Sequence, residues 1–213
     1  MILKPQFYQD GQCRDERDYR LTREELGLDP NLPTVLVMFG GFGAKTAVEI
    51  VDRLDHSGLR VQSIVMCGHN EKLRQALQGR ESCHAVGFTE KVPHYMRLAD
   101  FFIGKPGPGS ISEAVHMGLP AIIEGNTRTL PQERYNTIWV KEQKLGVVIS
   151  SFRHIAEAVR VLLEDNRLEQ FRRNAQRITN RAVYEIPEIL EQILEADAVV
   201  PQFSTANGKI PHH

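Results

Sequence analysis

The sequence is short of cysteine, of net charge and of long apolar runs, and each shortage argues against a class of protein. Its cysteines, Cys13, Cys67 and Cys83, form no CxxC pair, which argues against a disulfide framework or a structural zinc site and favours a reducing compartment. The 26 basic residues nearly balance the 27 acidic residues, so no overall field attracts nucleic acid. No apolar run reaches the ~20 residues of a membrane-spanning helix, and the N-terminus lacks a signal-peptide pattern. We therefore expect a globular cytoplasmic protein.

Short apolar runs that alternate with segments of helical spacing make up the middle of the chain. Six such runs occur, at residues 34–39, 63–68, 83–88, 101–105, 120–125 and 146–149. A continuous apolar run of this length is typical of a strand buried on both faces. Strands that alternate with helices form a parallel sheet through right-handed crossovers. The sequence therefore predicts an α/β fold with a Rossmann-like doubly wound parallel sheet of about six strands.

Composition and periodicity divide the chain into four parts. These are a linker-like N-terminal segment with a short helix, the sheet domain, a group of packing helices and a tail, over residues 1–33, 34–150, 151–196 and 197–213. In the first part, Thr22 and Glu25 have the spacing of a capping box. In the third, Ser151 is a predicted N-cap, and Pro187 is predicted to lie at an early helical position, where proline is tolerated.

The GGFG sequence that follows the first predicted strand is the first of two glycine-rich loops. Glycine lets the backbone turn tightly there, and the start of the next helix attracts phosphate. A P-loop would need glycine in place of Phe39 and Ala44, so we reject an ATPase or GTPase. The dinucleotide pattern GxGxxG also fails, because aligning it on Gly41 and Gly43 puts Thr46 at the third glycine. The loop is therefore another kind of phosphate-binding turn or an ordinary strand-to-helix connection.

The second glycine-rich loop is KPGPGSISEA at residues 105–114, and its pattern is more specific. Gly109 and Ser110 fall at a predicted helix start, where free N–H groups and the helix dipole attract a diphosphate. Glu113 lies one turn further on, where a carboxylate can accept hydrogen bonds from two ribose hydroxyls. In the alternative interpretation, Ser110 caps the helix and Glu113 is a charge that the dipole favours.

A third polar segment begins another predicted helix. Gln132 and Glu133 lie at its start, and Asn136 shares a face with both by its spacing. Amide and carboxylate groups suit a sugar, because hydroxyls both donate and accept hydrogen bonds. Taken alone, the segment is better explained as a solvated helix end.

The order of these motifs along the chain carries more information than any one of them. They are GGFG at 40–43, GF at 87–88, Ala99-Asp100, KPGPGSISEA at 105–114, GLP at 118–120 and QExxN at 132–136. This order resembles the C-terminal domain of glycosyltransferase family 28, whose members have the GT-B architecture of two Rossmann-like domains across a cleft. Within that family the chain is most similar to monogalactosyldiacylglycerol synthases and bacterial diacylglycerol glucosyltransferases. The resemblance covers about residues 1–196.

The resemblance implies that the chain binds a UDP-hexose as donor substrate. The backbone around Phe88 would bind the uracil, and Glu113 would bind the ribose. The diphosphate would be held by residues of both glycine loops, namely Gly41, Gly43, Gly109 and Ser110. The sugar hydroxyls would be held by Gln132, Glu133 and Asn136. Because GT-B enzymes stabilise the leaving UDP with a helix dipole and basic groups, the resemblance implies neither a metal nor a cofactor.

The resemblance also implies an inverting hexosyltransferase that uses a lipid acceptor such as diacylglycerol. Family members carry an N-terminal domain that supplies most acceptor contacts and the general base. The catalytic residue is therefore unknown, and this chain alone is expected to be inactive. The lipid would be bound by that domain or by a partner chain, with peripheral association at a membrane. Four histidines are expected to be surface or partly packed residues, namely His69, His84, His94 and His116.

Two other functions fit the same residues. A non-catalytic donor-binding subunit would need a separate partner chain with the acceptor domain, and an exposed apolar patch would support that arrangement. A UDP-sugar epimerase or hydrolase would need carboxylates or histidines close to the sugar, where Glu133 and Glu124 are the candidates.

Overall fold

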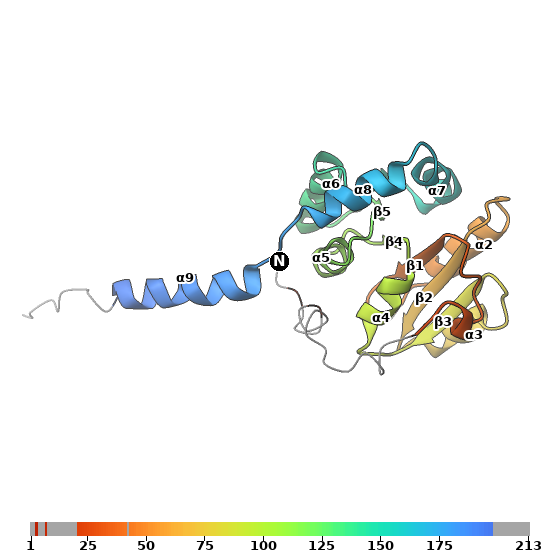
Figure 1. Cartoon of the computed structure of the whole chain (residues 1–213), viewed down its shortest axis with the longest axis horizontal. Helices are drawn as coiled ribbons and strands as arrows, with labels where there is room; N and C mark the ends of the chain where they lie inside the picture. The colour runs from red at the N-terminus through yellow and green to blue at the C-terminus, as the bar shows by residue number, and fades with distance from the viewer. Residues whose placement is uncertain (1–2, 4–6, 8–20, 42, 198–213) are drawn as a thin grey trace, which may run out of the picture. The chain divides into compact units, whose positions relative to one another are not determined.

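The computed structural model of the chain describes residues 3, 7, 21–41 and 43–197. These residues fall into two compact units, which are divided between Asn180 and Arg181 (Figure 1). The first unit carries a sheet, and the second contains one described helix, α9 (Ala182–Asp197). No helix within the described residues combines the length and the apolar composition that crossing a membrane requires.

The first unit is built on a parallel sheet of six strands in the order β3-β2-β1-β4-β5-β6. The strands are β1 (Thr34–Met38), β2 (Gln62–Gly68), β3 (Cys83–Gly87), β4 (Phe101–Gly104), β5 (Ala121–Glu124) and β6 (Gly146–Ile149). Each strand coincides with one of the predicted apolar runs, so the Rossmann-like doubly wound sheet is confirmed. The strand order reverses between β1 and β4, and the crevice at the carboxyl end of such a switch point is where ligands bind.

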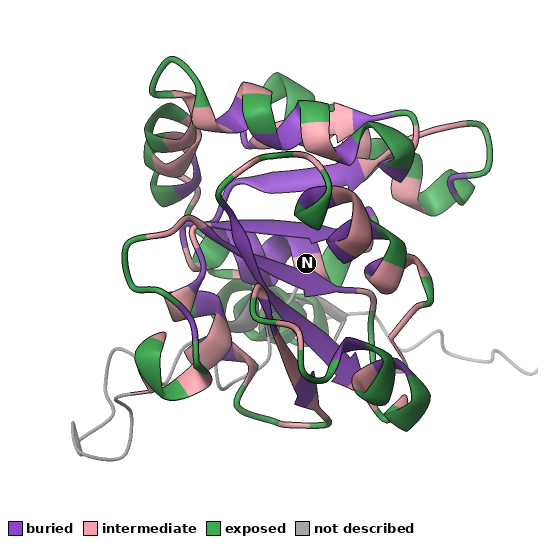
Figure 2. Cartoon of the chain, turned by 90° about the vertical axis from the view of Figure 1, so that its right-hand side faces the viewer, coloured by how far each residue is buried: buried purple, intermediate pink, exposed green. Residues whose placement is uncertain are grey.

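Helices cover both faces of the sheet. They are η1 (Glu24–Leu26), α2 (Thr46–Asp55), α3 (Glu71–Leu77), α4 (Val92–Leu98), α5 (Pro108–His116), α6 (Pro131–Glu142), η2 (Phe152–His154), α7 (Ile155–Leu163) and α8 (Arg167–Gln176), where η marks a 3-10 helix. Helices α2, α3 and α7 bury their apolar sides in one core cluster, and α4, α5 and α6 bury theirs in the other. Figure 2 shows the resulting pattern, with buried strands between helices whose outer sides are exposed.

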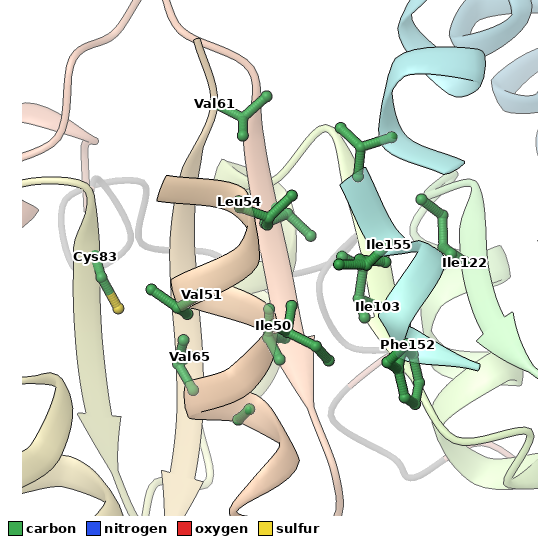
Figure 3. Packing of buried hydrophobic residues seen from close by; sticks show 14 of the residues in the cluster. Ile50, Val51, Leu54, Val61, Val65, Cys83, Ile103, Ile122, Phe152 and Ile155 are labelled. Carbon is green, nitrogen blue, oxygen red and sulfur yellow. The ribbon is translucent and has the colours of Figure 1, made fainter. Parts of the chain in front are cut away.

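Alternation along the strands explains the two clusters. Val35 and Val37 of β1 belong to the first cluster, whereas Leu36 and Met38 belong to the second, because successive side chains of a strand point to opposite faces. Figure 3 shows part of the first cluster, in which residues of α2, β4 and α7 pack together, for example Ile50, Ile103 and Ile155. Both faces of β1 are therefore fully buried, as its continuous apolar run predicts.

Two predicted helix caps are present in the structure. The Thr22 N–H donates to Glu25 Oε2 at 2.8 Å and the Glu25 N–H donates to Thr22 Oγ1 at 3.2 Å, which confirms the capping box. Ser151 accepts a hydrogen bond from the Arg153 N–H. The element that Ser151 caps is η2, a single turn that leads directly into α7.

The position predicted for Pro187 is wrong. Helix α9 begins at Ala182, so Pro187 lies inside the helix, where it removes one backbone hydrogen bond. The apolar stripe predicts a start near Ile186, but the helix begins four residues earlier and includes Ala182 and Glu185, residue types that favour helix. The large apolar side chains of α9 are exposed, so its predicted packing remains a prediction.

A cluster of charged groups lies at the amino-terminal edge of the sheet. Asp100, which precedes β4, accepts hydrogen bonds from the Thr34 N–H at 2.8 Å and from Arg23 at 2.9 Å. Arg172 of α8 lies 3.4 Å from the second carboxylate oxygen. The carboxylate thus joins the N-terminal segment, two central strands and α8 at the edge opposite the loops that follow the strands.

At the carboxyl edge, the end of β2 lies in direct contact with the first glycine loop. The His69 N–H donates to the Gly41 carbonyl at 2.9 Å. Gly68 has a φ of +57°, and a Cβ atom built on it would lie 2.0 Å from the Gly41 oxygen. Only glycine fits at position 68, because any side chain would push the loop away from the strand.

We expect Gly68→Ala to lower the free energy of unfolding by clearly more than Gly58→Ala. Both residues have a positive φ, +57° and +73°, which costs an alanine about 1–2 kcal/mol. Only Gly68 adds a clash, because nothing lies within 4 Å of a Cβ built on Gly58. Urea unfolding of the two variants measures the difference, and equal losses would show that the contact with Gly41 can relax freely.

Candidate functional site

Two of the cavities at the carboxyl edge of the sheet contain predicted site residues, and they are lined by neighbouring parts of the chain, the start of α5 and the loop that precedes it. The first, which we call the glycine cavity, has a volume of about 240 Å³ and is lined by Met38, Gly40, Gly41, Met66, Gly68, Gly87, Phe88, Thr89, Val92, Gly109, Ser110 and Glu113. The second, the polar cavity, has a volume of about 600 Å³ and is lined by Lys105, Pro106, Glu124, Asn126, Thr127, Arg128, Thr129, Leu130, Glu133, Ser150, Ser151, Arg153 and His154.

The glycine cavity brings together five of the predicted site residues, namely Gly41, Phe88, Gly109, Ser110 and Glu113. They come from the ends of β1 and β3 and from the start of α5. Parallel strands place these ends at one edge, so residues far apart in the chain meet there. Because five of the twelve lining residues are glycines, backbone forms much of the wall and a ligand can approach it closely.

The start of α5 offers unpaired backbone donors to this cavity. Pro108 is the first helical residue and Gly107 is the N-cap, so Ser110 is not the N-cap. The first helical hydrogen bond runs from the Ile111 N–H to the Gly107 carbonyl at 3.2 Å. The N–H groups of Gly109 and Ser110 therefore have no carbonyl partner inside the helix. Together with the positive end of the helix dipole, they make an anion-binding position.

Glu113 lies one turn further along α5 and is only 7% exposed. It lines the same cavity as Gly109 and Ser110. Its carboxylate therefore lies within one helical turn of the two backbone donors, an arrangement that suits a ligand with both an anionic group and hydroxyl groups.

An aromatic pair lies at the mouth of the glycine cavity. The rings of His69 and Phe88 stack with centroids 4.0 Å apart and planes 17° apart, and Phe88 is 59% exposed. The sequence assigns no role to His69. Its position directly after Gly68, at the end of a buried strand, is the signal that would have drawn attention to it.

The other predicted site residues lie outside the glycine cavity. Glu133 lines the polar cavity, and Gln132 is exposed on the first turn of α6. Asn136 is only 4% exposed and donates from Nδ2 to the Pro106 carbonyl at 2.7 Å. A Cβ built on Gly43 would lie 2.9 Å from the Cys67 carbonyl, so close packing explains that glycine.

Hydrogen bonds fix the walls of the polar cavity. Asn126 donates from Nδ2 to the Ser150 carbonyl at 2.9 Å, and Arg134 donates from Nε to the Thr129 carbonyl at 3.2 Å. Glu124 accepts a hydrogen bond from the Phe152 N–H at 3.3 Å. The cavity carries basic and acidic side chains together, namely Lys105, Arg128, Arg153, Glu124 and Glu133, which suits a polar and uncharged ligand better than a dense anion.

The described cysteines do not supply a nucleophile. Burial raises the pKa of the Cys67 thiol to about 11 and that of the Cys83 thiol to about 12, so both thiols are protonated at neutral pH, and the thiolate is the reactive form. Cys13 lies outside the described residues. Among residues 21–41 and 43–197, no three His, Cys, Asp or Glu side chains gather as a metal site would require.

Comparisons with known proteins found similar sequences and similar structures. Residues 34–193 match the glycosyltransferase family 28 C-terminal domain. The chain is 33% identical to a probable monogalactosyldiacylglycerol synthase of Glycine max, over 95% of this chain and 39% of the relative. It is 29% identical to a processive diacylglycerol beta-glucosyltransferase of Bacillus pumilus, over 95% of this chain and 52% of the relative. The chain thus spans about half of these relatives or less.

Two solved structures share the fold. MurG of Acinetobacter baumannii superposes with a TM-score of 0.62 at 14% identity, over 81% of this chain and 53% of that one. The glycosyltransferase WaaG superposes with a TM-score of 0.59 at 20% identity, over 90% of this chain and 54% of that one. In both, the match covers about half of a longer protein.

We expect Asn136→Ala to lower the free energy of unfolding by about 1–3 kcal/mol, because it leaves the carbonyl of the buried Pro106 without its donor. Asn174→Ala is the matched control. It removes the same kind of bond, from Nδ2 to the Lys144 carbonyl at 2.9 Å, at an exposed position, and should cost about 0.5 kcal/mol or less. Urea unfolding measures both, and equal losses would contradict a special role for Asn136.

Proposed function

The chain belongs to the glycosyltransferase family 28 C-terminal domain family, and from this premise we propose that it binds the nucleotide-sugar donor of a glycosyltransferase. The donor is a UDP-hexose, and the reaction inverts the anomeric carbon. The observation that carries the proposal is the start of α5. There the Gly109 and Ser110 N–H groups and the Glu113 carboxylate belong to one cavity.

The glycine cavity would bind the uridine. The peptide groups next to Phe88 can pair with the edge of the uracil, since backbone N–H and C=O groups match its carbonyls and N–H. The Glu113 carboxylate would accept hydrogen bonds from the ribose hydroxyls, which are stronger than neutral ones because the acceptor is charged. Exclusion of water by the walls around this half-buried ligand would strengthen both contacts.

The diphosphate would lie at the start of α5, against the Gly109 and Ser110 N–H groups and near Gly41. The sugar would then extend into the polar cavity, which is lined by Lys105 and Pro106 of the loop that leads into α5. There Glu133, with Gln132 at the rim, would bind the hydroxyls. We assign Asn136 mainly to holding the loop, because its amide is buried against Pro106. Gly43 would contribute to the first glycine loop by its packing.

In the proposed reaction, a general base removes the proton of the acceptor hydroxyl, and that oxygen attacks the anomeric carbon. The bond between this carbon and the β-phosphate oxygen breaks, and UDP leaves with the bonding electrons. The dipole of α5 and its two N–H groups stabilise the charge that develops on UDP. We assign the base to none of the described residues.

The acceptor is proposed to be a lipid such as diacylglycerol, bound outside the donor site. The names of both relatives contain this lipid, and they differ in the sugar, galactose in one and glucose in the other. We therefore propose a hexose without choosing between the two. A cytoplasmic domain that meets its acceptor at a membrane surface fits this assignment.

We expect UDP to raise the thermal unfolding midpoint of the chain. At a UDP concentration a hundredfold above Kd, binding adds about 2.7 kcal/mol of stability, which is roughly 5–10 °C for a chain of this size. ATP and NAD should leave the midpoint unchanged, because the proposed base contacts in the cavity are specific for uracil. Differential scanning fluorimetry measures the shift. If millimolar UDP produces none, the donor site is wrongly assigned.

We expect Glu113→Ala to weaken UDP binding by at least about tenfold, because one charge-assisted hydrogen bond contributes about 1.5–3 kcal/mol. Gln132→Ala should leave UDP affinity unchanged and weaken only a UDP-hexose, because Gln132 would contact the sugar. Calorimetric titration of both variants with both ligands measures this. 2′-Deoxy-UDP should bind the unaltered chain more weakly than UDP, with little difference on Glu113→Ala, which lacks the acceptor. Equal effects of both alanine variants on UDP would contradict the ribose assignment.

A further inference from the structure

Large exposed apolar side chains are concentrated at one place on the first unit. Among its described residues, four such side chains are exposed: Phe88, Leu130, Tyr135 and Ile138. Phe88 belongs to the glycine cavity. The other three are 52%, 68% and 50% exposed and lie within nine residues of one another, at the start of α6 and along it.

Helical spacing places Tyr135 and Ile138 on the outer face of α6, one turn apart. The buried residues of the same helix, Asn136 and Val140, lie on the opposite side, against the rest of the unit. Leu130 is the N-cap residue of α6. We call Leu130, Tyr135 and Ile138 the α6 outer surface.

Basic side chains surround this surface. Arg134 and Lys141 lie on the turns before and after Ile138, and both are exposed. Arg134 donates hydrogen bonds to the Thr129 and Thr127 carbonyls, which holds its guanidinium beside Leu130.

Arg128 in the preceding loop is exposed as well, and Glu142 is the acidic residue on the same face of α6 as Ile138. Three cations and one anion therefore give the α6 outer surface a positive charge.

We propose that the α6 outer surface docks on the surface of an anionic lipid bilayer. Tyrosine and aliphatic side chains partition into the headgroup region of a bilayer, and each nearby Lys or Arg adds attraction to anionic lipids. The surface adjoins the polar cavity, because Leu130 belongs to both and the nearby Arg128 also lines the cavity. The inference rests on the proposed function, in which the sugar occupies that cavity and the acceptor is a lipid. A bilayer docked here lies beside the sugar that is transferred.

Helix α9 also exposes large apolar side chains, but it differs from the α6 outer surface in charge. Its exposed side chains include Ile189, Leu190 and Ile193, so it is as apolar as the α6 outer surface. Between Ala182 and Asp197 it carries acidic residues and no basic ones. An anionic bilayer repels such a helix, so the charge assigns the docking surface to α6.

Trp139, the single tryptophan of the chain, lies next to Ile138 and is half-buried. Its emission should shift to shorter wavelength when the α6 outer surface enters the headgroup region. The test mixes the full chain, without UDP, with vesicles of phosphatidylcholine alone and with vesicles that also contain phosphatidylglycerol. We expect the shift, and co-sedimentation, only with the second kind, and with an affinity that falls as salt is added.

Three variants separate the contributions. Tyr135→Ser with Ile138→Ser should weaken vesicle binding at least about tenfold, because it removes most of the inserted apolar area. Arg128→Gln with Lys141→Gln should abolish the preference for phosphatidylglycerol. Ile189→Ser with Leu190→Ser on α9 should leave binding unchanged. All of these side chains are exposed, so thermal midpoints should stay close to that of the unaltered chain.

Any of the following results would overturn the proposal. No binding of the unaltered chain to either vesicle, or equal binding by the α6 serine variant, removes the bilayer as the partner. Loss of binding in the α9 variant moves the contact to α9. A dimer in sedimentation equilibrium that the α6 serine variant dissociates, without vesicle binding, makes the partner a second copy. The UDP shift is measured without vesicles, so failure of the donor site is recognised separately.

Discussion

The contact between the Gly41 carbonyl and the end of β2 is the constraint from which the candidate site follows. Because Gly68 carries no side chain, the Gly41 carbonyl can approach the end of β2 and accept a hydrogen bond from the His69 N–H. Backbone then forms much of the wall of the glycine cavity, which is lined by the ends of β1 and β3 and by the start of α5. A ligand in this cavity would meet the backbone donors at the start of α5.

Much of the fold, and five of the nine predicted site residues as one group, could be read from the sequence. Strands buried on both faces are continuous apolar runs. This pattern reflects burial, so it can be recognised without knowing which elements cover the strand. Parallel strands then bring the loops after them to one edge, so Phe88 and Ser110 meet in one cavity. This grouping of loops follows from the common direction of the parallel strands and needs no knowledge of side-chain contacts.

Pairings between distant elements could not be predicted. Spacing places Asn136 on a helix face with Glu133, but nothing in the sequence shows that its amide binds Pro106. The stack of His69 on Phe88 joins two loops in the same way. The start of α9 was misplaced for a different reason. The residues from Ala182 to Glu185 do not continue the apolar stripe, so the helix extends beyond the part that periodicity can identify.

The Asp100 cluster has a consequence for how such a domain can diversify. It ties the N-terminal segment, β1, β4 and α8 together at the edge remote from both cavities. Cohesion of the framework and recognition of a ligand therefore depend on separate ends of the same strands. Loops at the recognition end, such as the one between β5 and α6, can be exchanged for others of different shape while the anchoring end stays intact. New ligand preferences can in this way arise on one unaltered scaffold.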